Sequence, residues 1–266
     1  MFGVDAAVVL FCVFANGRPA SFSIARSNEG GKPPVGGACN ALEFAWGNYT
    51  DLFGKFTFGK YLWNSVFITV IATLITLLFN SMAAFALSKY RFSGQKAVYL
   101  LIIGTLMIPP TIILVPVFLV INEVGLLNSL WGVILPAVAT PTGVFLLRQY
   151  MLTIPDELIE AARMDHASEW RIYWRIVLPL LKPALGTLGL ITFIASWNNF
   201  IGPLIILRSP EMYTLPLALR SLQSPVDTEW GALMAGSAIA VIPLLIIFIF
   251  SSRRLIAGLT SGAVRG

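Results

Sequence analysis

A charged stretch interrupts an otherwise apolar chain, and its side chains are the first candidates for chemistry. From Glu160 to Pro179 the sequence EAARMDHASEWRIYWRIVLP contains three acids, three arginines and the only histidine of the chain. Thr153, with Asp156 as its capping-box partner, predicts a short helix over residues 154–165, and Ser168 is placed to cap a second helix. Two short charged helices of this kind offer a surface that a partner protein could bind.

The second expected helix carries an apolar stripe. Trp170, Tyr173, Trp174 and Val177 recur at helical spacing, and Pro179 stands at the end of the helix. Such a stripe can face a partner protein, or it can place both helices on the lipid interface, where Trp and Tyr side chains are common. The spacing alone does not separate these two interpretations.

A second group of candidate residues consists of an aromatic ring and three amides inside apolar segments: Trp197, Asn198, Asn199 and Asn64. An indole face and amide groups at membrane depth suit stacking against a sugar and hydrogen bonding to its hydroxyls. The alternative is that these side chains hold neighbouring helices together, at about 0.6–2 kcal/mol for each hydrogen bond. Both interpretations remain open.

The elements that carry these residues are membrane helices. Hydrophobic residues make up 57% of the chain and charged residues 12%, against about 25% charged in soluble domains, and the mean hydropathy is +0.80. Backbone at membrane depth must satisfy its own hydrogen bonds, so the spans are helices. We expect an all-α, polytopic membrane helix bundle with five clear transmembrane helices and a doubtful N-terminal one. The five runs, none of which contains Asp, Glu, Lys, Arg or His, are Leu62–Leu87, Val98–Val120, Leu130–Leu147, Ala184–Leu207 and Gly231–Ser252.

Prolines predict that the second and third of these helices are not straight. The pair Pro109 and Pro110, together with Pro116, Pro136 and Pro141, each removes an amide donor from a helix. Kinks or broken turns are therefore expected there, either for packing geometry or for a direct role in gating.

Basic residues predict the orientation in the membrane. The connection after the first clear helix, residues 148–182, and the C-terminal tail are rich in Lys and Arg, whereas the opposite loops hold only Arg208 and Arg220. Because basic loops face the cytoplasm, the charged stretch and the C-terminus are expected to be cytoplasmic.

The charged stretch resembles a known loop. Glu160-Ala161-Ala162, followed by Ile176, Leu178 and Pro179, is similar to the EAA loop of permease subunits of bacterial ABC importers that take solute from a binding protein. The resemblance implies that this loop docks into a cytoplasmic ATPase and couples it to the membrane helices. Glu160 would make a charged contact, and Ala161 and Ala162 would allow close approach.

One position departs from that family. The family run usually reads EAAxxDGA, whereas this chain has Asp165 followed by His166 in place of the glycine. The glycine allows a turn with positive φ, a conformation that His adopts at a higher cost than Gly. His166 is therefore expected to keep the turn, as a tolerated substitution or as a switch that titrates near neutral pH.

The rest of the chain, from about Trp46, resembles the carbohydrate branch of these permeases, similar to the smaller maltose-type subunit. The motifs are NYT at 48–50, YLWNSVFIT at 61–69, AAFALSKYRFSG at 83–94, MIPP at 107–110, RQYMLTIPDELIEAA at 148–162, SWNNF at 196–200 and GLTSGAVRG at 258–266. The resemblance implies a transmembrane permease domain over residues 61–252 with a coupling loop at 148–182. It also implies a cytoplasmic tail at 253–266, which would reach into the ATPase dimer.

The N-terminal segment, residues 1–60, is atypical for that family. Its only apolar run, Phe2–Ala15, is short and contains Asp5, and residues 16–39 look irregular. The simplest expectation is an N-terminus that is truncated or altered relative to its relatives, with or without a true first helix.

The resemblance also implies the partners. They are an ABC ATPase dimer that holds ATP and magnesium, a second permease subunit, an extracytoplasmic solute-binding protein, and a sugar or oligosaccharide, all at the bacterial cytoplasmic membrane and in contact with its lipid. Neither a cofactor bound by this chain nor a nucleic-acid partner is expected. Cys12 and Cys39 fit neither a disulfide framework nor a metal site.

The residues themselves also constrain the energy source. The apolar runs hold no ionisable residue through which a proton-coupled carrier could draw energy, and the chain has no GxxxxGK[ST] phosphate loop. We therefore expect a non-enzymatic transport subunit driven by a separate ATPase. The alternatives are an ABC permease for another small polar solute, such as a glycerol phosphate, a polyamine or an osmolyte, and a secondary carrier.

Overall fold

The computed structural model describes residues 46–55, 57–223 and 230–263. The N-terminal apolar run and irregular stretch predicted from the sequence lie outside these residues. Contacts between Cα atoms divide the chain into two compact units, and each is described by itself. Unit 1 consists of residues 1–64 and 213–246, and unit 2 consists of residues 65–212 and 247–266.

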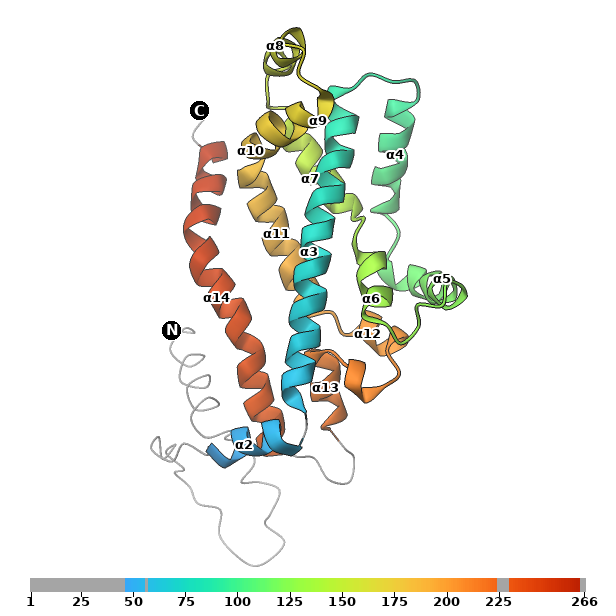
Figure 1. Ribbon diagram of the computed structural model, residues 1–266, viewed down its shortest axis with the longest axis vertical. Coiled ribbons are helices and arrows are strands. Elements are labelled where there is room, and N and C mark those ends of the chain that lie inside the picture. Colours follow the sequence, from blue (N-terminus) through green and yellow to red (C-terminus); the bar gives the residue numbers. More distant parts are fainter. Residues whose placement is uncertain (1–45, 56, 224–229, 264–266) are drawn as a thin grey trace, which may run out of the picture. The chain divides into compact units, whose positions relative to one another are not determined.

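Unit 1 packs around one buried aromatic ring. Phe58 is almost fully buried, and Phe53 meets it edge-on with 5.5 Å between ring centroids. Gly236 lies so close that a Cβ there would come within 3.1 Å of the Phe58 ring, so this contact depends on the missing side chain. The unit contains α2 (Trp46–Lys55), the start of α3 (Phe58–Lys89), α13 (Leu215–Ser221) and the start of α14 (Trp230–Ala263) (Figure 1).

Unit 2 contains the remainder of α3 and the shorter helices that follow it (Figure 1). They are α4 (Gln95–Thr105), α5 (Pro110–Glu123), α6 (Leu130–Ala137), α7 (Pro141–Met151), α8 (Glu157–Met164), α9 (Glu169–Ile172), the π-helix η2 (Tyr173–Val177), α10 (Leu178–Leu180), α11 (Lys182–Trp197), α12 (Ile201–Ile206) and the 3-10 turn η3 (Pro210–Met212).

The described helices provide up to five membrane crossings. By length and composition, α3 and residues 232–249 of α14 are each long and apolar enough to span a bilayer. Three further candidates are bent pairs: α4 with α5 at 105°, α6 with α7 at 43°, and the 169–180 segment with α11 at 77°. The predicted breaks at Pro109-Pro110 and around Pro136 and Pro141 are confirmed, because the first two bends lie there.

The bend between α6 and α7 is compensated by α3. Pro141 has no amide, so the carbonyl of Ala137 lacks its normal helical donor. The buried hydroxyl of Thr76 donates to that carbonyl at 3.2 Å, and the amide of Asn80 donates to the hydroxyl of Thr140 at 2.8 Å. A Cβ at Gly143 would overlap the Asn80 amide, so a glycine is required at that position.

The predicted helix over residues 184–207 is wrong as a single element. Helix α11 ends at Trp197, and α12 begins at Ile201. The side chain of Asn199 accepts a hydrogen bond from the amide of Gly202 at 3.2 Å, and Pro203 has no amide with which to continue the α11 ladder. Polar side chains inside an apolar run therefore ended a helix that hydropathy alone would have continued.

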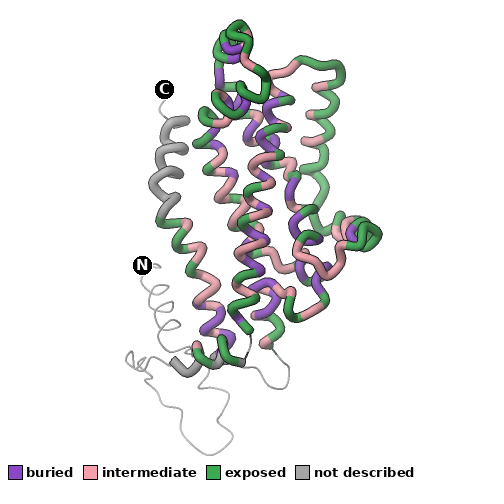
Figure 2. Tube along the Cα trace, viewed as in Figure 1, coloured by how far each residue is buried: buried purple, intermediate pink, exposed green. Residues whose placement is uncertain are grey.

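The core of unit 2 lies where the charged stretch packs against α3 and α7. Its buried members come from α3, α7, α8, α9, η2 and α11, and they include Phe85, Met151, Ile159 and Ile172. Figure 2 shows buried segments gathered in these elements, whereas most of α4 and α5 is exposed. The loop over residues 148–182, called the EAA loop below, thus contributes buried residues to the core of unit 2.

Candidate functional site

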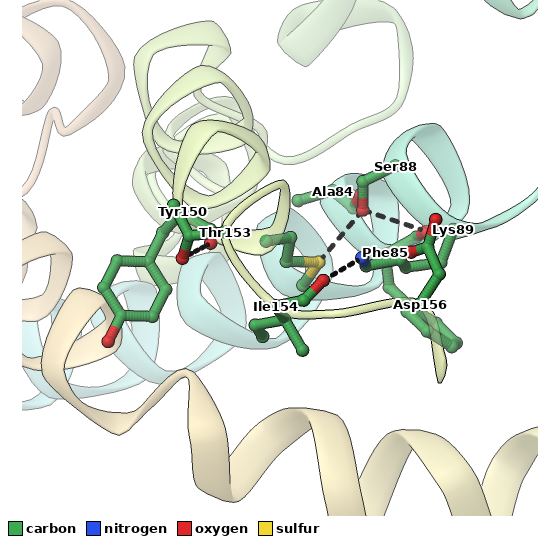
Figure 3. Close-up of polar contacts among 9 residues, drawn as sticks. Ala84, Phe85, Ser88, Lys89, Tyr150, Thr153, Ile154 and Asp156 are labelled. Carbon is green, nitrogen blue, oxygen red and sulfur yellow. Dashed lines mark hydrogen bonds and ion pairs between the residues drawn. The ribbon is translucent and has the colours of Figure 1, made fainter. Parts of the chain in front are cut away.

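The first helix of the EAA loop begins later than the sequence predicts. The Thr153 hydroxyl donates to the carbonyl of Tyr150 at 2.7 Å instead of capping a helix, and α8 starts only at Glu157 (Figure 3). Asp156, the predicted capping-box partner, instead accepts a hydrogen bond from Lys89 at 2.5 Å. The predicted Thr153 cap is wrong because the hydroxyl and the amide of Thr153 both bond back to the carbonyl of Tyr150, and Lys89 binds the carboxylate of Asp156. The predicted Ser168 cap is confirmed, since its hydroxyl accepts from the amide of Arg171 at 3.3 Å.

The turn between the two helices has His166 in the left-handed region, with φ of 56°. The amide of His166 donates to the carbonyl of Arg163, and the amide of Ala167 donates to that of Ala162, both at 3.0 Å. These two bonds form a Schellman motif, in which a helix ends on a left-handed residue that is usually glycine. The expected positive φ at His166 is confirmed.

The residues predicted to couple to an ATPase fall into two groups. Glu160, Ala161, Asp165, His166 and Pro179 are exposed. Ala162 is buried against the chain's own core, and Ile176 and Leu178 are half-buried and pack against it as well. The outward face of α8 therefore offers Glu160 and Ala161, while Ala162 holds the helix in place.

The apolar stripe of the second helix is divided in the same way. Tyr173 and Val177 are buried, and the Tyr173 hydroxyl bonds that of Ser81 on α3 at 2.7 Å. Trp170 and Trp174 keep 58% and 43% of their surfaces exposed. One side of the stripe is core, and only the tryptophans remain available to lipid or to a partner.

The N-terminal end of α8 is held by the last residue of α3. The Lys89 ammonium donates to the carbonyl of Ile154 at 2.6 Å and to the carboxylate of Asp156 at 2.5 Å (Figure 3). The Lys89 side chain is only 4% exposed, whereas that of Asp156 is 67% exposed. The hydrogen bond and charge of Lys89 lower the pKa of the Asp156 carboxyl below its usual range.

The C-terminal end of α8 is held by Glu169 of α9. Arg163 donates to the two carboxylate oxygens of Glu169 at 2.7 and 3.2 Å, and the Tyr90 hydroxyl donates to the same carboxylate at 2.6 Å. The bond from Arg163 lowers the pKa of Glu169 and raises that of Arg163. Burial, followed by the contact with Glu169, raises the pKa of Tyr90 to about 12.

Sequence reasoning missed Lys89, Tyr90, Arg163 and Glu169 as members of this site. Lys89 lies 67 positions from Asp156 and Tyr90 lies 79 positions from Glu169, so no local spacing pairs them. Together with Glu160 these residues line a polar hollow of about 530 Å³. Within the described part of the chain, no three His, Cys, Asp or Glu side chains gather in a way that could hold a metal ion.

The residues predicted to line a substrate path have contacts within the chain. In unit 1, the buried amide of Asn64 donates to the carbonyl of Tyr213 at 3.1 Å. In unit 2, Trp197 is buried and stacks on Phe193, Asn199 caps the start of α12, and the exposed Asn198 donates to the carbonyl of Ile194 at 2.9 Å. Of this group, Asn198 is the amide that is both exposed and at the end of a membrane helix.

Curated relatives match most of the chain. Residues 78–261 match the family described as "Binding-protein-dependent transport system inner membrane component". The chain is 41% identical over 220 residues to the arabinooligosaccharides transport system permease protein AraQ of Bacillus subtilis (strain 168), covering 82% of this chain and 78% of that protein. It is 32% identical over 212 residues to the lactose transport system permease protein LacG of Rhizobium radiobacter, covering 80% and 78%.

Other relatives have a different solute in their names. The sn-glycerol-3-phosphate transport system permease protein UgpE of Yersinia enterocolitica is 36% identical over 204 residues, covering 76% of this chain and 73% of that protein. The fold is similar to a crystal structure of a bacterial ABC transporter involved in the import of the acidic polysaccharide alginate. That match has a TM-score of 0.77 and 23% identity, and it covers 95% of both chains.

Proposed function

Because the chain belongs to the family of binding-protein-dependent transport system inner membrane components, we propose that it is a membrane-spanning permease subunit of an ATP-driven sugar importer. In this role it forms part of the translocation path, and its EAA loop docks on a separate ATPase. A second permease subunit and an extracytoplasmic solute-binding protein complete the transporter, with the EAA loop and the C-terminus in the cytoplasm.

The exposed face of α8 is the observation that carries the docking proposal. Glu160 and Ala161 point outward on a helix whose opposite side, at Ile159 and Ala162, is fixed in the core. A carboxylate next to a small side chain allows an ionic contact at short range. The helix is also closed at its C-terminus by the Schellman turn at His166, which gives it a defined end.

The names of the relatives support a sugar as the solute. Arabinooligosaccharides and lactose are the solutes of two of them, and both are neutral carbohydrates rich in hydroxyls. Asn198 is the first candidate for a sugar contact, because it is exposed at the end of α11 next to Trp197. All three amides have backbone partners, but Asn64 is buried and Asn199 is half-buried, which supports a structural role for these two.

A glycerol phosphate is the second candidate solute, because a permease named for sn-glycerol-3-phosphate is 36% identical to this chain. The two candidates differ in charge. A phosphate ester is bound most strongly by cationic donors, whereas the five apolar runs of this chain contain no Lys or Arg. This difference supports the neutral sugar for the part of the path that this chain supplies.

The docking proposal is tested by co-purification of the co-expressed ATPase with this chain in detergent. We expect Glu160→Lys and Ala161→Asp to lose the ATPase that the natural chain retains. Lys96→Glu, a charge change at an exposed position of α4, is the matched control and should retain it. Ala162→Asp is unsuitable, because it would bury a charge in the core. Equal retention by all four chains would exclude this face of α8 as the dock.

The solute is tested by uptake into vesicles that contain the assembled transporter with its binding protein. Labelled arabinooligosaccharide, lactose and sn-glycerol-3-phosphate are compared at equal concentration. Each is measured with and without ATP on the side of the membrane that carries the ATPase. We expect ATP-dependent uptake of a sugar and none of the phosphate ester. Uptake of sn-glycerol-3-phosphate alone would replace the sugar by the second candidate and leave the docking proposal intact.

A further inference from the structure

Two consecutive residues at the end of α3 hold the two ends of α8. Lys89 binds the segment that enters α8, through the carbonyl of Ile154 and the carboxylate of Asp156. Tyr90 reaches the other end through Glu169, which is bonded in turn to Arg163 in the last turn of α8. Helix α8 is therefore attached at both of its ends to Lys89, the last residue of α3, and to Tyr90, which directly follows it.

The side of α8 between these two attachments is also fixed. Ile159 and Ala162 are buried in the same cluster as Ala84 and Phe85, which belong to the last turns of α3. Packed interiors resist small displacements, so apolar contact along this side prevents α8 from rolling between its two attached ends. Two polar attachments and one apolar side together leave little freedom of α8 relative to the end of α3.

Glu169 is suited to the joint between Tyr90 and Arg163. A carboxylate can accept hydrogen bonds on both oxygens at once, and here it accepts two from the guanidinium and one from the phenol. A neutral amide in its place would offer one accepting oxygen and a donating NH2 group, so it could not keep all three hydrogen bonds, and the charge that attracts Arg163 would be lost. The joint therefore needs an acid at this position, although no part of the EAA pattern calls for one.

From this geometry we propose that Lys89 and Tyr90 form a two-point clasp that makes α8 and the C-terminal end of α3 move as one body, with Glu169 as the positioning residue of the clasp. The inference rests on the proposed function, because it states how a displacement of α8 by a docked ATPase reaches the membrane helices. A docked ATPase would displace α8 at Glu160, and the contacts of Tyr90 and Lys89 would transmit that displacement to the C-terminal end of α3.

The test is amide hydrogen exchange, followed by mass spectrometry, of the chain in complex with its ATPase, with and without ATP. Without ATP, Glu169→Gln should speed exchange in peptides covering residues 157–167 by about two- to fivefold, the range expected for loss of one partly exposed ion pair. Glu157→Gln is the control, because it removes a carboxylate from the first turn of α8 outside the clasp, and it should speed exchange less than Glu169→Gln does.

Tyr90→Phe separates coupling from structure. It releases the α3 arm but keeps the pair of Arg163 with Glu169. In the natural chain ATP should alter exchange both in α8 and in peptides covering residues 83–90. In Tyr90→Phe the change in α8 should persist, while the change at the end of α3 becomes smaller. A role that is only structural would alter both in parallel.

Two results would overturn the clasp. One is exchange in Glu169→Gln equal to that of the natural chain, and the other is an undiminished response of residues 83–90 in Tyr90→Phe. Failure of the proposed function is recognised separately, because the ATPase would then not be retained by the natural chain at all. The ATP-free comparison of Glu169→Gln with Glu157→Gln can be made on the chain alone, so it still decides the clasp.

Discussion

The two ends of unit 2 are held together by different chemistry. At the EAA end, the ion pair of Lys89 with Asp156 joins segments 67 positions apart, and a second ion pair joins Arg163 to Glu169 of the next helix. At the opposite end, near α6 and α12, the neutral side chain of Asn128 joins the start of α6 to the segment that follows α12. The side-chain oxygen Oδ1 of Asn128 accepts hydrogen bonds from the backbone amides of Arg208 and Ser209 at 3.0 and 2.9 Å. The side-chain nitrogen Nδ2 of Asn128 donates to the Ser209 hydroxyl at 2.8 Å.

This difference indicates what each end has to do. A partly exposed ion pair such as Arg163 with Glu169 contributes only about 0–1 kcal/mol, because water and salt compete for both partners. An amide bonded to two backbone groups fixes the path of a loop, because any movement leaves those groups unpaired. The EAA end thus depends on ion pairs that pH and salt can weaken, set on a packed core, and the Asn128 end depends on neutral hydrogen bonds that respond to neither.

Asn128→Ala should give the largest effect on stability. The substitution removes three side-chain hydrogen bonds and leaves alanine at a φ of 56°, where Asn is tolerated far better. We expect the free energy of unfolding, measured by SDS titration in mixed micelles, to fall by about 2–4 kcal/mol. Asn128→Gly removes the bonds without the backbone strain and should lose less. Equal losses in the two variants would mean that strain makes no contribution.

Lys89→Met should have a smaller effect, even though it removes a buried charge. The methionine stem can fill the space of the lysine stem, and the exposed Asp156 carboxylate can turn to water. We expect a loss of about 1–2 kcal/mol in the same titration. A loss larger than that of Asn128→Ala would show that the EAA end, and not the Asn128 end, is the rigid one.

The two ends should also respond differently to pH. The carboxyls of Asp156 and Glu169 have lowered pKa values in the folded chain, so their contacts stabilise it at pH above the ordinary carboxyl range and are lost as the pH falls through the lowered values. Tyr90, with a pKa raised to about 12, contributes below pH 10 and loses its bond as the pH rises toward that value.

We therefore expect the difference in stability between the natural chain and Glu169→Gln to be greatest at neutral pH and to shrink below about pH 4, near the ordinary range of carboxyl pKa values. Molar salt should reduce it as well. The difference between the natural chain and Asn128→Ala should stay constant under both treatments. A Glu169→Gln difference that is constant with pH and salt would remove the distinction between the two ends.

The substitution His166→Gly should have the smallest effect. The residue sits in the left-handed C′ position of the Schellman turn, where glycine has no steric cost. His166→Gly should change the free energy of unfolding by less than about 1 kcal/mol, in the stabilising direction, while His166→Val should lose about 1–2 kcal/mol. Stabilisation by His166→Val would mean that the turn does not depend on backbone conformation.

The sequence predicted the local features of the EAA loop well. The Ser168 cap and the positive φ at His166 each depend on a few neighbouring residues, and both are confirmed. The Thr153 cap failed because Asp156 has a stronger partner in Lys89, which no local rule includes. Ala162 was expected on the contact face, but it packs inward, because the pattern EAA does not state which alanine faces the core.

The helices show the same limit. The prolines predicted the bends between α4 and α5 and between α6 and α7. A proline removes a backbone hydrogen bond from the helix that contains it, whatever that helix packs against. The break after Trp197 was not predicted, because the run from Ala184 to Leu207 contains no charged residue and its amides were assigned to a sugar or to a neighbouring helix. The break depends on a hydrogen bond between the side chain of Asn199 and the backbone amide of Gly202 in α12, in place of a bond to another helix.

By itself, therefore, the sequence determined that the chain is a bundle of membrane helices, where proline breaks them, and which loop carries the EAA pattern. These features follow from hydropathy, missing amides and short-range spacing, each of which can be evaluated within one continuous segment of the chain. Only the tertiary structure decided that Lys89 and Tyr90 hold the two ends of α8. It also decided that Thr76 donates to the carbonyl left unpaired by Pro141, and that Asn128 fixes the opposite loop. Each of these contacts joins residues more than 60 positions apart, and a polar side chain selects such a partner only after folding has brought the candidates together.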